Sequence, residues 1–131
     1  MTETLVTSFA PSGVHGVDLS LSISGLTLTV PAASVMYKSS SYVLALDEVH
    51  TVGSYVVDCV VAGYLVIDTA NSNDLRVFVD EFLQDGIDAP YEFENSPYEL
   101  ITCLYQFTVP PGTTDLSTLD WYRWSIAPEP N

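Results

Sequence analysis

One polar stretch of the chain gathers oxygen-bearing side chains. Asp68, Asn71, Asn73 and Asp74 fall within seven consecutive residues. Carboxylate and amide oxygens are the ligands of Ca²⁺, which takes about six to eight of them. The spacing is not that of an EF-hand loop, and Asn, Asp and Ser in turns commonly bind their own backbone amides. We therefore expect no cofactor, with a calcium ion at these four residues as the alternative.

Motifs of nucleophilic or metal catalysis are missing from the sequence. His15 and His50 have no partner at the spacing of a triad or a metal site, and GxSxG, Walker A and HExxH sequences do not occur. Glycoside hydrolysis requires only two carboxylates at a fixed separation, and 17 acidic residues would bring some pair together by chance. We expect a protein that is not an enzyme, and paired carboxylates are the catalytic alternative.

The two cysteines lie in apolar, strand-like segments. Cys59 stands in VDCVVAG and Cys103 in LITCLYQF, where a free thiol acts as a small hydrophobic residue. The first residues, MTETLVTSF, lack the basic region and the long apolar core of a signal peptide. We therefore expect a protein that is made and used without export, with both thiols reduced and in the core.

The charge of the chain excludes two classes of partner. Seventeen acidic residues against Lys38, Arg76 and Arg123 give a net charge of -14, which repels phosphate backbones and anionic lipid surfaces. No apolar run approaches the roughly 20 residues of a transmembrane helix. We expect neither nucleic acid nor a membrane as a partner. The acidic surface fits a partner with a basic face, or it serves solubility alone.

The Asp- and Asn-rich stretch separates two β-rich runs. Residues 55–68 are apolar on both faces, which is typical of a strand covered on both sides. Residues 75–82 alternate between apolar and polar positions, as in a half-exposed strand. Residues 69–74 supply the turn chemistry. The sequence predicts a long hairpin at the centre of a sheet.

Shorter strands, separated by Gly, Pro and Ser turns, make up the rest of the chain. We expect them at 17–24, 26–30, 35–37, 42–46, 100–109 and 119–126. Residues 47–53 are expected as a connection, and residues 113–117 as one helical turn. This spacing predicts an all-β fold, an antiparallel β-sandwich or barrel of about 8–10 short strands.

The length of 131 residues suits a single domain with one core. Pro11, Gly13 and Gly16 oppose a compact helix near the start, so residues 1–16 are expected as an N-terminal arm. Residues 17–126 then form the β domain and residues 127–131 a flexible tail. The arm presents Leu5, Val6 and Phe9, which would pair with a neighbouring subunit or lie across their own domain.

The last strand carries residue types that are common in interfaces. Trp121 and Arg123 share one face, and Tyr122 and Trp124 share the other, because side chains alternate along a strand. If the second face fills the core, the first exposes a Trp beside an Arg, as in protein-binding hot spots and sugar-stacking sites. The alternative is a Trp that lies flat on its own domain with the Arg stacked on it.

A long acidic segment, QDGIDAPYEFENSP at 84–97, is expected as an exposed loop. It exceeds ordinary connections in length, and loops of this kind tend to be functional or mobile. Tyr91 and Phe93 are its candidate contact residues. With the arm and the Trp121 face, this loop is the third expected site of assembly contacts.

The order of the strand and turn sequences resembles a known family. GLTLTVPAASVMY, YVLAL, YLVIDT, RVFVDEF and LYQFTVPPGTTDLSTLDW together span residues 25–124. They resemble β-rich modules of tailed-bacteriophage virion proteins of the tail-fibre, baseplate or fibre-attachment type, in which V-P-A-G turns, Y-L-V-x-D strands and V-P-x-G-T-x-D-L turns recur.

The resemblance implies a non-enzymatic virion structural protein, assembled in the cytoplasm of the host bacterium. Such a protein forms homo-oligomers and links tail, baseplate or fibre components, so its partners are copies of itself and other virion proteins with basic surfaces. Capsid decoration is the close alternative. A carbohydrate-binding module for host recognition is the second alternative, in which Trp121 and the loop from Tyr91 to Tyr98 would stack on a glycan.

Overall fold

The computed structural model describes residues 3–6, 14–16 and 21–124. Phe9, residues 17–20 of the first expected strand, and the C-terminal residues 125–131 lie outside the described residues. The elements are β1 (Glu3–Val6), β2 (Val14–Gly16), β3 (Ser22–Ser24), β4 (Thr27–Val30), β5 (Ala33–Tyr37), β6 (Ser40–Leu44), β7 (Glu48–Thr51), β8 (Cys59–Asp68), β9 (Asp74–Leu83), β10 (Tyr98–Val109), the 3₁₀ turn η1 (Leu116–Thr118) and β11 (Trp121–Trp124).

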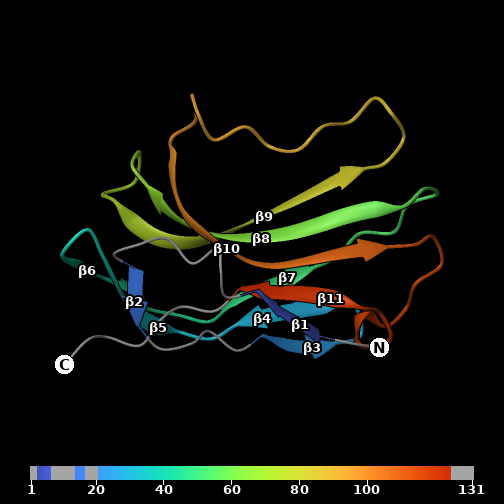
Figure 1. Ribbon diagram of the computed structural model, residues 1–131, viewed down its shortest axis with the longest axis horizontal. Coiled ribbons are helices and arrows are strands. Elements are labelled where there is room, and N and C mark those ends of the chain that lie inside the picture. Colours follow the sequence, from blue (N-terminus) through green and yellow to red (C-terminus); the bar gives the residue numbers. More distant parts are fainter. Residues whose placement is uncertain (1–2, 7–13, 17–20, 125–131) are drawn as a thin grey trace.

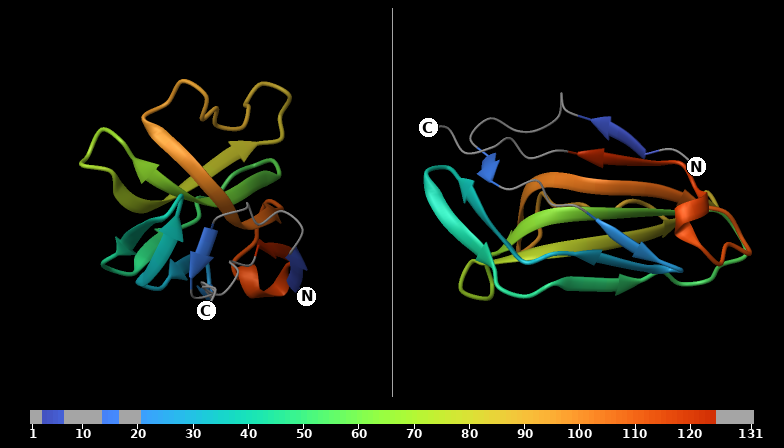
Figure 2. Two further views of the ribbon diagram at one scale, coloured as in Figure 1. Left: turned by 60° about the vertical axis from the view of Figure 1, so that its left-hand side comes forward. Right: turned by 90° about the horizontal axis from the view of Figure 1, so that it is seen from below.

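The strands form two layers, which confirms the predicted all-β sandwich. One layer is a five-stranded sheet in the order β1-β11-β10-β8-β9. The other consists of two small sheets, β2-β5-β6 and β3-β4-β7, which pack against one face of the large sheet (Figure 1). In the left view of Figure 2, β11 and β1 curve down beside the small sheets. All pairs are antiparallel except β1 with β11, which run parallel.

Strand β8 is the central element of the large sheet. It pairs with β10 on one side and β9 on the other, and nine of its ten residues are buried. The predicted hairpin of two β-rich runs is confirmed, with its turn at residues 69–73. Its first strand begins at Cys59 and not at residue 55, and β9 is an edge strand because no described strand pairs with its other side.

The described chain has eleven strands where about 8–10 were expected, because β1 and β2 lie in the expected arm and β7 in the expected connection. A bulge separates β4 from β5 and β6 from β7. Val30 pairs with Glu48 and Ala33 with Leu44, so residues 31–32 oppose residues 45–47. The extra residue bends both strands. The Ala32 amide, which would otherwise lose its partner, donates to Asp47 Oδ1 at 2.9 Å.

Strand β7 corrects the sequence-based prediction of a plain connection at 47–53. Its four residues pair with β4, from Thr27 opposite Thr51 to Val30 opposite Glu48. The segment EVHT has the alternation of a strand, but only one of its four residues is aliphatic. Pairing with β4, rather than its own apolar content, makes it a strand.

The β5–β6 hairpin closes with Lys38 and Ser39, which have φ angles of 49° and 65°. Two successive positive φ angles define the type I′ turn, whose twist matches that of the flanking strands. Neither residue is glycine, so each pays about 1 kcal/mol for the left-handed conformation. The strong pairing from Ala33 to Leu44 offsets that cost.

The core between the layers is mainly aliphatic and includes the aromatic side chains Tyr37, Tyr105, Phe107 and Trp121. Tyr105 and Phe107 on β10 are almost fully buried, and Tyr105 crosses β8 at Gly63. A Cβ atom at Gly63 would lie 2.2 Å from the Tyr105 ring. Glycine is required there because the ring occupies the space of a side chain.

Both cysteines are free thiols; Cys59 lies in the core, as predicted, whereas Cys103 is half-buried and lies outside it. Within the described ranges, no helix has the length and apolar composition needed to cross a membrane.

Candidate functional site

The acidic loop 84–97 lies along the outer face of the large sheet, at the top of Figure 1. Its Tyr91 and Phe93 rings pack on Phe78 of β9, with ring centroids 4.5 Å and 5.8 Å away. Phe93 also contacts Tyr64 of β8 at 5.0 Å, and Tyr98 at the start of β10 contacts Phe78 at 5.0 Å. We call these five rings the aromatic cluster.

The aromatic cluster explains why β8 is buried on both faces. Val60, Ala62 and Val66 share the outer face of β8 with Tyr64 and are at most 5% exposed. They do not belong to the core between the layers. The loop therefore covers a second apolar layer. Tyr91 and Phe93, predicted as contact residues for a partner, pack instead against side chains of their own chain.

Carboxylates fix the backbone of the loop. Asp80 Oδ2 accepts the Tyr91 amide at 2.8 Å, and Asp88 Oδ2 accepts the Leu83 amide at 2.8 Å. Asp85 Oδ1 accepts the amides of Ile87 and Asp88 at 2.8 Å and 2.9 Å. The Asp88 and Ile87 amides lower the pKa of Asp85, because they stabilise its ionised form. These hydrogen bonds restrain the backbone of the loop, and Ile87 is 89% exposed at its first bend.

The four residues considered for calcium lie in the β8–β9 turn. Asp68 is buried and accepts the Ala70 amide at 3.2 Å and Asn71 Nδ2 at 2.8 Å. Arg76 Nε lies 3.3 Å from Asp68 Oδ2, and an Arg76 terminal nitrogen lies 3.7 Å from Asp74 Oδ2. Asn73 has a φ of 56° and shapes the turn. The turn is closed by its own side chains and by an arginine, which fits the Asx-turn alternative.

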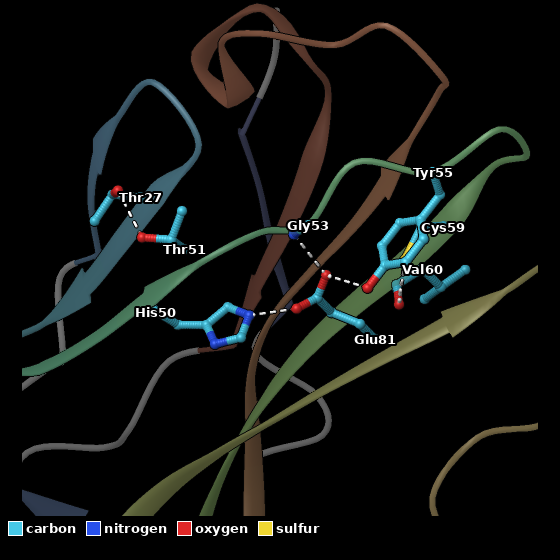
Figure 3. A network of polar contacts seen from close by, with 8 residues as sticks. All are labelled: Thr27, His50, Thr51, Gly53, Tyr55, Cys59, Val60 and Glu81. Atoms are coloured by element: carbon cyan, nitrogen blue, oxygen red, sulfur yellow. Dashed lines mark hydrogen bonds and ion pairs between the residues drawn. The ribbon is translucent and has the colours of Figure 1, made fainter.

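The one described cluster that resembles catalytic chemistry joins β7 to β9 (Figure 3). His50 Nε2 donates to Glu81 Oε2 at 2.6 Å. The other oxygen of Glu81 accepts the Gly53 amide at 3.0 Å and the Tyr55 hydroxyl at 3.3 Å. Both carboxylate oxygens are thus occupied, and the pair connects the two layers at the open edge of the sandwich.

No activated nucleophile accompanies the His50–Glu81 pair among the residues drawn in Figure 3. Cys59 lies behind Tyr55, and burial followed by the charge of Glu81 raises its pKa to about 11. Burial and Glu81 also raise the pKa of Tyr55. Both groups stay protonated near neutral pH, whereas nucleophilic attack by cysteine requires the thiolate. The pair can act as a structural clasp.

Beside this clasp a cavity of 120 Å³ opens between the layers. It is lined by four valines, Val30, Val49, Val77 and Val79, together with Glu48, His50 and Tyr105. Within the described residues no three His, Cys, Asp or Glu side chains are placed to hold a metal ion. Local sequence patterns do not predict the His50–Glu81 pair, because 31 residues separate its two members along the chain.

Trp121 is buried, whereas the sequence-based prediction placed it on the surface. It is only 8% exposed and stacks on Phe107, with a centroid distance of 5.0 Å and an interplanar angle of 5°. The predicted exposed Trp beside an Arg is therefore wrong, because the Trp121 face of β11 points into the core. Tyr122 points the other way and is 50% exposed. Arg123 is half-buried and follows Trp121 on the inner side.

The described part of the arm pairs with its own domain. Leu5 and Val6 lie in β1, opposite Arg123 and Trp124 of β11. Of the two alternatives for the arm, the structure therefore has the one in which it lies across its own chain.

Comparison with known proteins gives one informative result. No protein-family model and no curated protein matches the sequence. Among solved structures, the gene 22 product of the Bacillus subtilis phage SPP1 is similar, with a TM-score of 0.71 and 10% sequence identity. The match covers 100% of this chain and 99% of the SPP1 protein. The two proteins share a fold over their whole lengths.

Proposed function

We propose that this chain is a non-enzymatic structural protein of a tailed-bacteriophage virion. The observation that supports it most strongly is the whole-length similarity of its fold to a phage gene product. The two chains align from end to end at only 10% identity, so the similarity lies in the fold and not in the sequence. The strand and turn motifs between residues 25 and 124, which resemble those of phage virion modules, also support the proposal.

The surface chemistry fits assembly within a particle. A net charge of -14 keeps the protein away from packaged nucleic acid and favours partners with basic faces. The exposed acids of the long loop, among them Glu92 and Glu94, are held on a fixed backbone by the aromatic cluster. A rigid charged loop loses little conformational entropy on binding, which suits a docking element.

Within the virion we propose the tail, at the baseplate or the fibre attachment, where the protein forms homo-oligomers. Capsid decoration is the alternative position. A carbohydrate-binding role has less support, because Trp121, the residue expected to stack on sugar rings, is occupied by Phe107. Tyr91 likewise packs inside the aromatic cluster.

The test is to find the protein on particles. Phage particles of the strain that encodes the chain are purified and analysed by mass spectrometry, and gold-labelled antibodies against the chain are imaged on them. We expect the protein in intact virions at fixed stoichiometry, with label at the distal tail. Label on the head would support decoration. Absence of the protein from purified virions, with synthesis in infected cells, would overturn the proposal.

A further inference from the structure

Two edge strands lie next to each other where the sandwich is open. Among the described strands, β9 is the last of the large sheet, and β7 is the last of the small sheet β3-β4-β7. The clasp between His50 and Glu81 joins them (Figure 3). An edge strand presents unpaired backbone donors and acceptors, with which an extended segment of another chain can pair. The opening between β7 and β9 is therefore a candidate binding surface.

The register of β9 shows which of its backbone groups point away from β8. The Gln84 amide donates to the Asp58 carbonyl oxygen at 2.8 Å, in register with the β8–β9 ladder. In an antiparallel pair, residues that exchange hydrogen bonds alternate with residues that do not. Val77, Val79 and Glu81 lie an odd number of residues before Gln84, so their amides and carbonyl oxygens face the open edge. Within the described residues, no hydrogen bond occupies the outward backbone groups of Val77 and Val79.

Two further hydrogen bonds fix the direction of these edges. The next outward amide of β9, that of Leu83, donates to Asp88 Oδ2 at 2.8 Å, so a side chain already caps the end of this edge. On β7, the Val52 amide donates to the Leu26 carbonyl oxygen at 2.9 Å, in register with the β4–β7 ladder. The backbone groups of Val49 therefore point away from β4. This explains why Val49 lines the cavity although its side chain is 62% exposed.

The cavity of 120 Å³ lies between the two edges, with residues of β7 and β9 in its lining. A cavity of about 150 Å³ holds one benzene molecule, so this one has room for a single side chain and not for a strand. A strand that pairs with β9 would extend the large sheet, and its residues would point alternately toward the small sheets and away from them. One inward side chain of such a strand can enter the cavity.

The chemistry of the cavity selects a basic side chain. Glu48 lines it, and within the described residues no hydrogen bond or ion pair occupies the Glu48 carboxylate. The valine walls suit the methylene stem of a lysine or arginine, and the carboxylate suits its charged head. The net charge of -14 attracts a basic segment to the chain as a whole.

We propose that an extended segment of another virion protein pairs with the free edge of β9 and places one lysine or arginine side chain in the cavity beside Glu48. The inference rests on the proposed function, which makes the partner a virion protein. Backbone hydrogen bonds along residues 77–81 hold the segment, and the basic side chain sets its register. A contact of this size is weak for one copy, and it strengthens when several copies on one particle bind together.

The experiment is an NMR titration of the purified, isotope-labelled full chain with capped seven-residue peptides. One peptide is Thr-Val-Thr-Lys-Thr-Val-Thr, and a second has Arg at the centre. Saturable shifts of amide signals are expected at residues 77–81 and 48–50, and the Kd should rise with salt. A peptide with Glu at the centre should bind at least ~tenfold more weakly. The N-methylated lysine peptide keeps its charge but cannot donate backbone hydrogen bonds, and should also bind at least ~tenfold more weakly.

Variants of the chain test the cavity itself. Glu48→Gln should raise the Kd about fivefold by removing the charge. The matched control Glu92→Gln makes the same change on the exposed acidic loop and should leave the Kd unchanged. Val79→Phe fills the cavity and should raise the Kd at least ~tenfold. Circular dichroism and Tm verify that each variant is folded.

Several outcomes would overturn the inference. These are the absence of saturable shifts with both basic peptides, shifts confined to loop 84–97, equal binding of the N-methylated peptide, and an unchanged Kd in Glu48→Gln. Shifts at residues 77–81 that depend on protein concentration without peptide would assign the edge to a second copy and overturn it as well. All of these are measured on the isolated chain, so a failure here is distinguishable from absence of the chain on virions, which tests the proposed function.

Discussion

The two outer faces of this sandwich differ in whether a loop shields them from solvent. The face of the large sheet is apolar and aromatic, and loop 84–97 covers it with Tyr91 and Phe93. The face of the small sheets carries short hydroxyl side chains and needs no cover. The covering loop carries exposed acids, whereas the bare face consists mainly of uncharged side chains. The two faces of one sandwich thus present different surface chemistry to solvent.

The largest loss of stability is expected when the Phe78 side chain, at the centre of the aromatic cluster, is removed. Phe78 contacts Tyr91, Phe93 and Tyr98, so Phe78→Ala should lower the free energy of unfolding by about 2–3 kcal/mol. Urea denaturation measures it. Val43→Ala on the bare face is the control and should cost less than about 0.5 kcal/mol in the monomer. Equal losses in the two variants would show that the faces do not differ in stability.

An intermediate effect is expected at the clasp between the layers. Glu81→Gln removes the negative charge of the group that is hydrogen-bonded to His50, Gly53 and Tyr55. It should lower the free energy of unfolding by about 1–2 kcal/mol. Hydrogen exchange should then rise in β7, which β9 holds through this carboxylate. Glu92→Gln, an exposed change on the covering loop, should leave both values unaltered. If exchange in β7 stayed as slow as in the wild type, the clasp would not hold that edge.

A smaller effect, on the pH dependence of Tm, is expected at Asp85 in the loop that covers the large sheet. The pKa of Asp85 is lower in the folded protein than the ordinary value of 3.8. The ionised carboxylate therefore stabilises the fold at pH values above 3.8. That contribution is lost as pH falls through the lowered pKa. The Tm of Asp85→Asn should lie below that of the wild type at neutral pH, and the two should converge in acid. A constant difference across the pH range would contradict the role of Asp85 in holding the loop.

The smallest effect is expected at the turn between β8 and β9, which belongs to neither face. Arg76 already lies between Asp68 and Asp74, so we expect addition of Ca²⁺ or of EDTA to leave Tm unchanged. Differential scanning calorimetry measures it. A rise of Tm with Ca²⁺ that EDTA reverses, and that is lost in Asn71→Ala, would revive the calcium alternative.

Sequence patterns predicted much of the local structure, although they missed strand β7. The two-sided apolar run of β8, the turn at residues 69–73 and the long loop after β9 all followed from composition and spacing. Even the capped turn at Leu116 was indicated by Asp115, which accepts the Ser117 amide at 3.0 Å. These features depend on neighbours in the chain, and local chemistry decides them.

Relations between distant segments could not be predicted in the same way. Alternation along β11 separates Trp121 from Tyr122, but it does not tell which faces the core. Phe107, a residue of the neighbouring strand, decides this by stacking on Trp121. The His50–Glu81 pair and the aromatic cluster likewise join β7 to β9 and the loop to the sheet. Tertiary pairing, which no local pattern encodes, places these side chains.

The pairing of β1 with β11 has a consequence for how the chain folds during synthesis. Residue 3 lies opposite residue 121, so β1 leaves the ribosome long before its partner exists. The β8–β9 hairpin can close as soon as its turn has been translated, whereas β1 must wait. Contacts between such distant residues form slowly because the intervening loop must first close. We expect β1 to dock last, after the nascent chain has built the sheet that receives it.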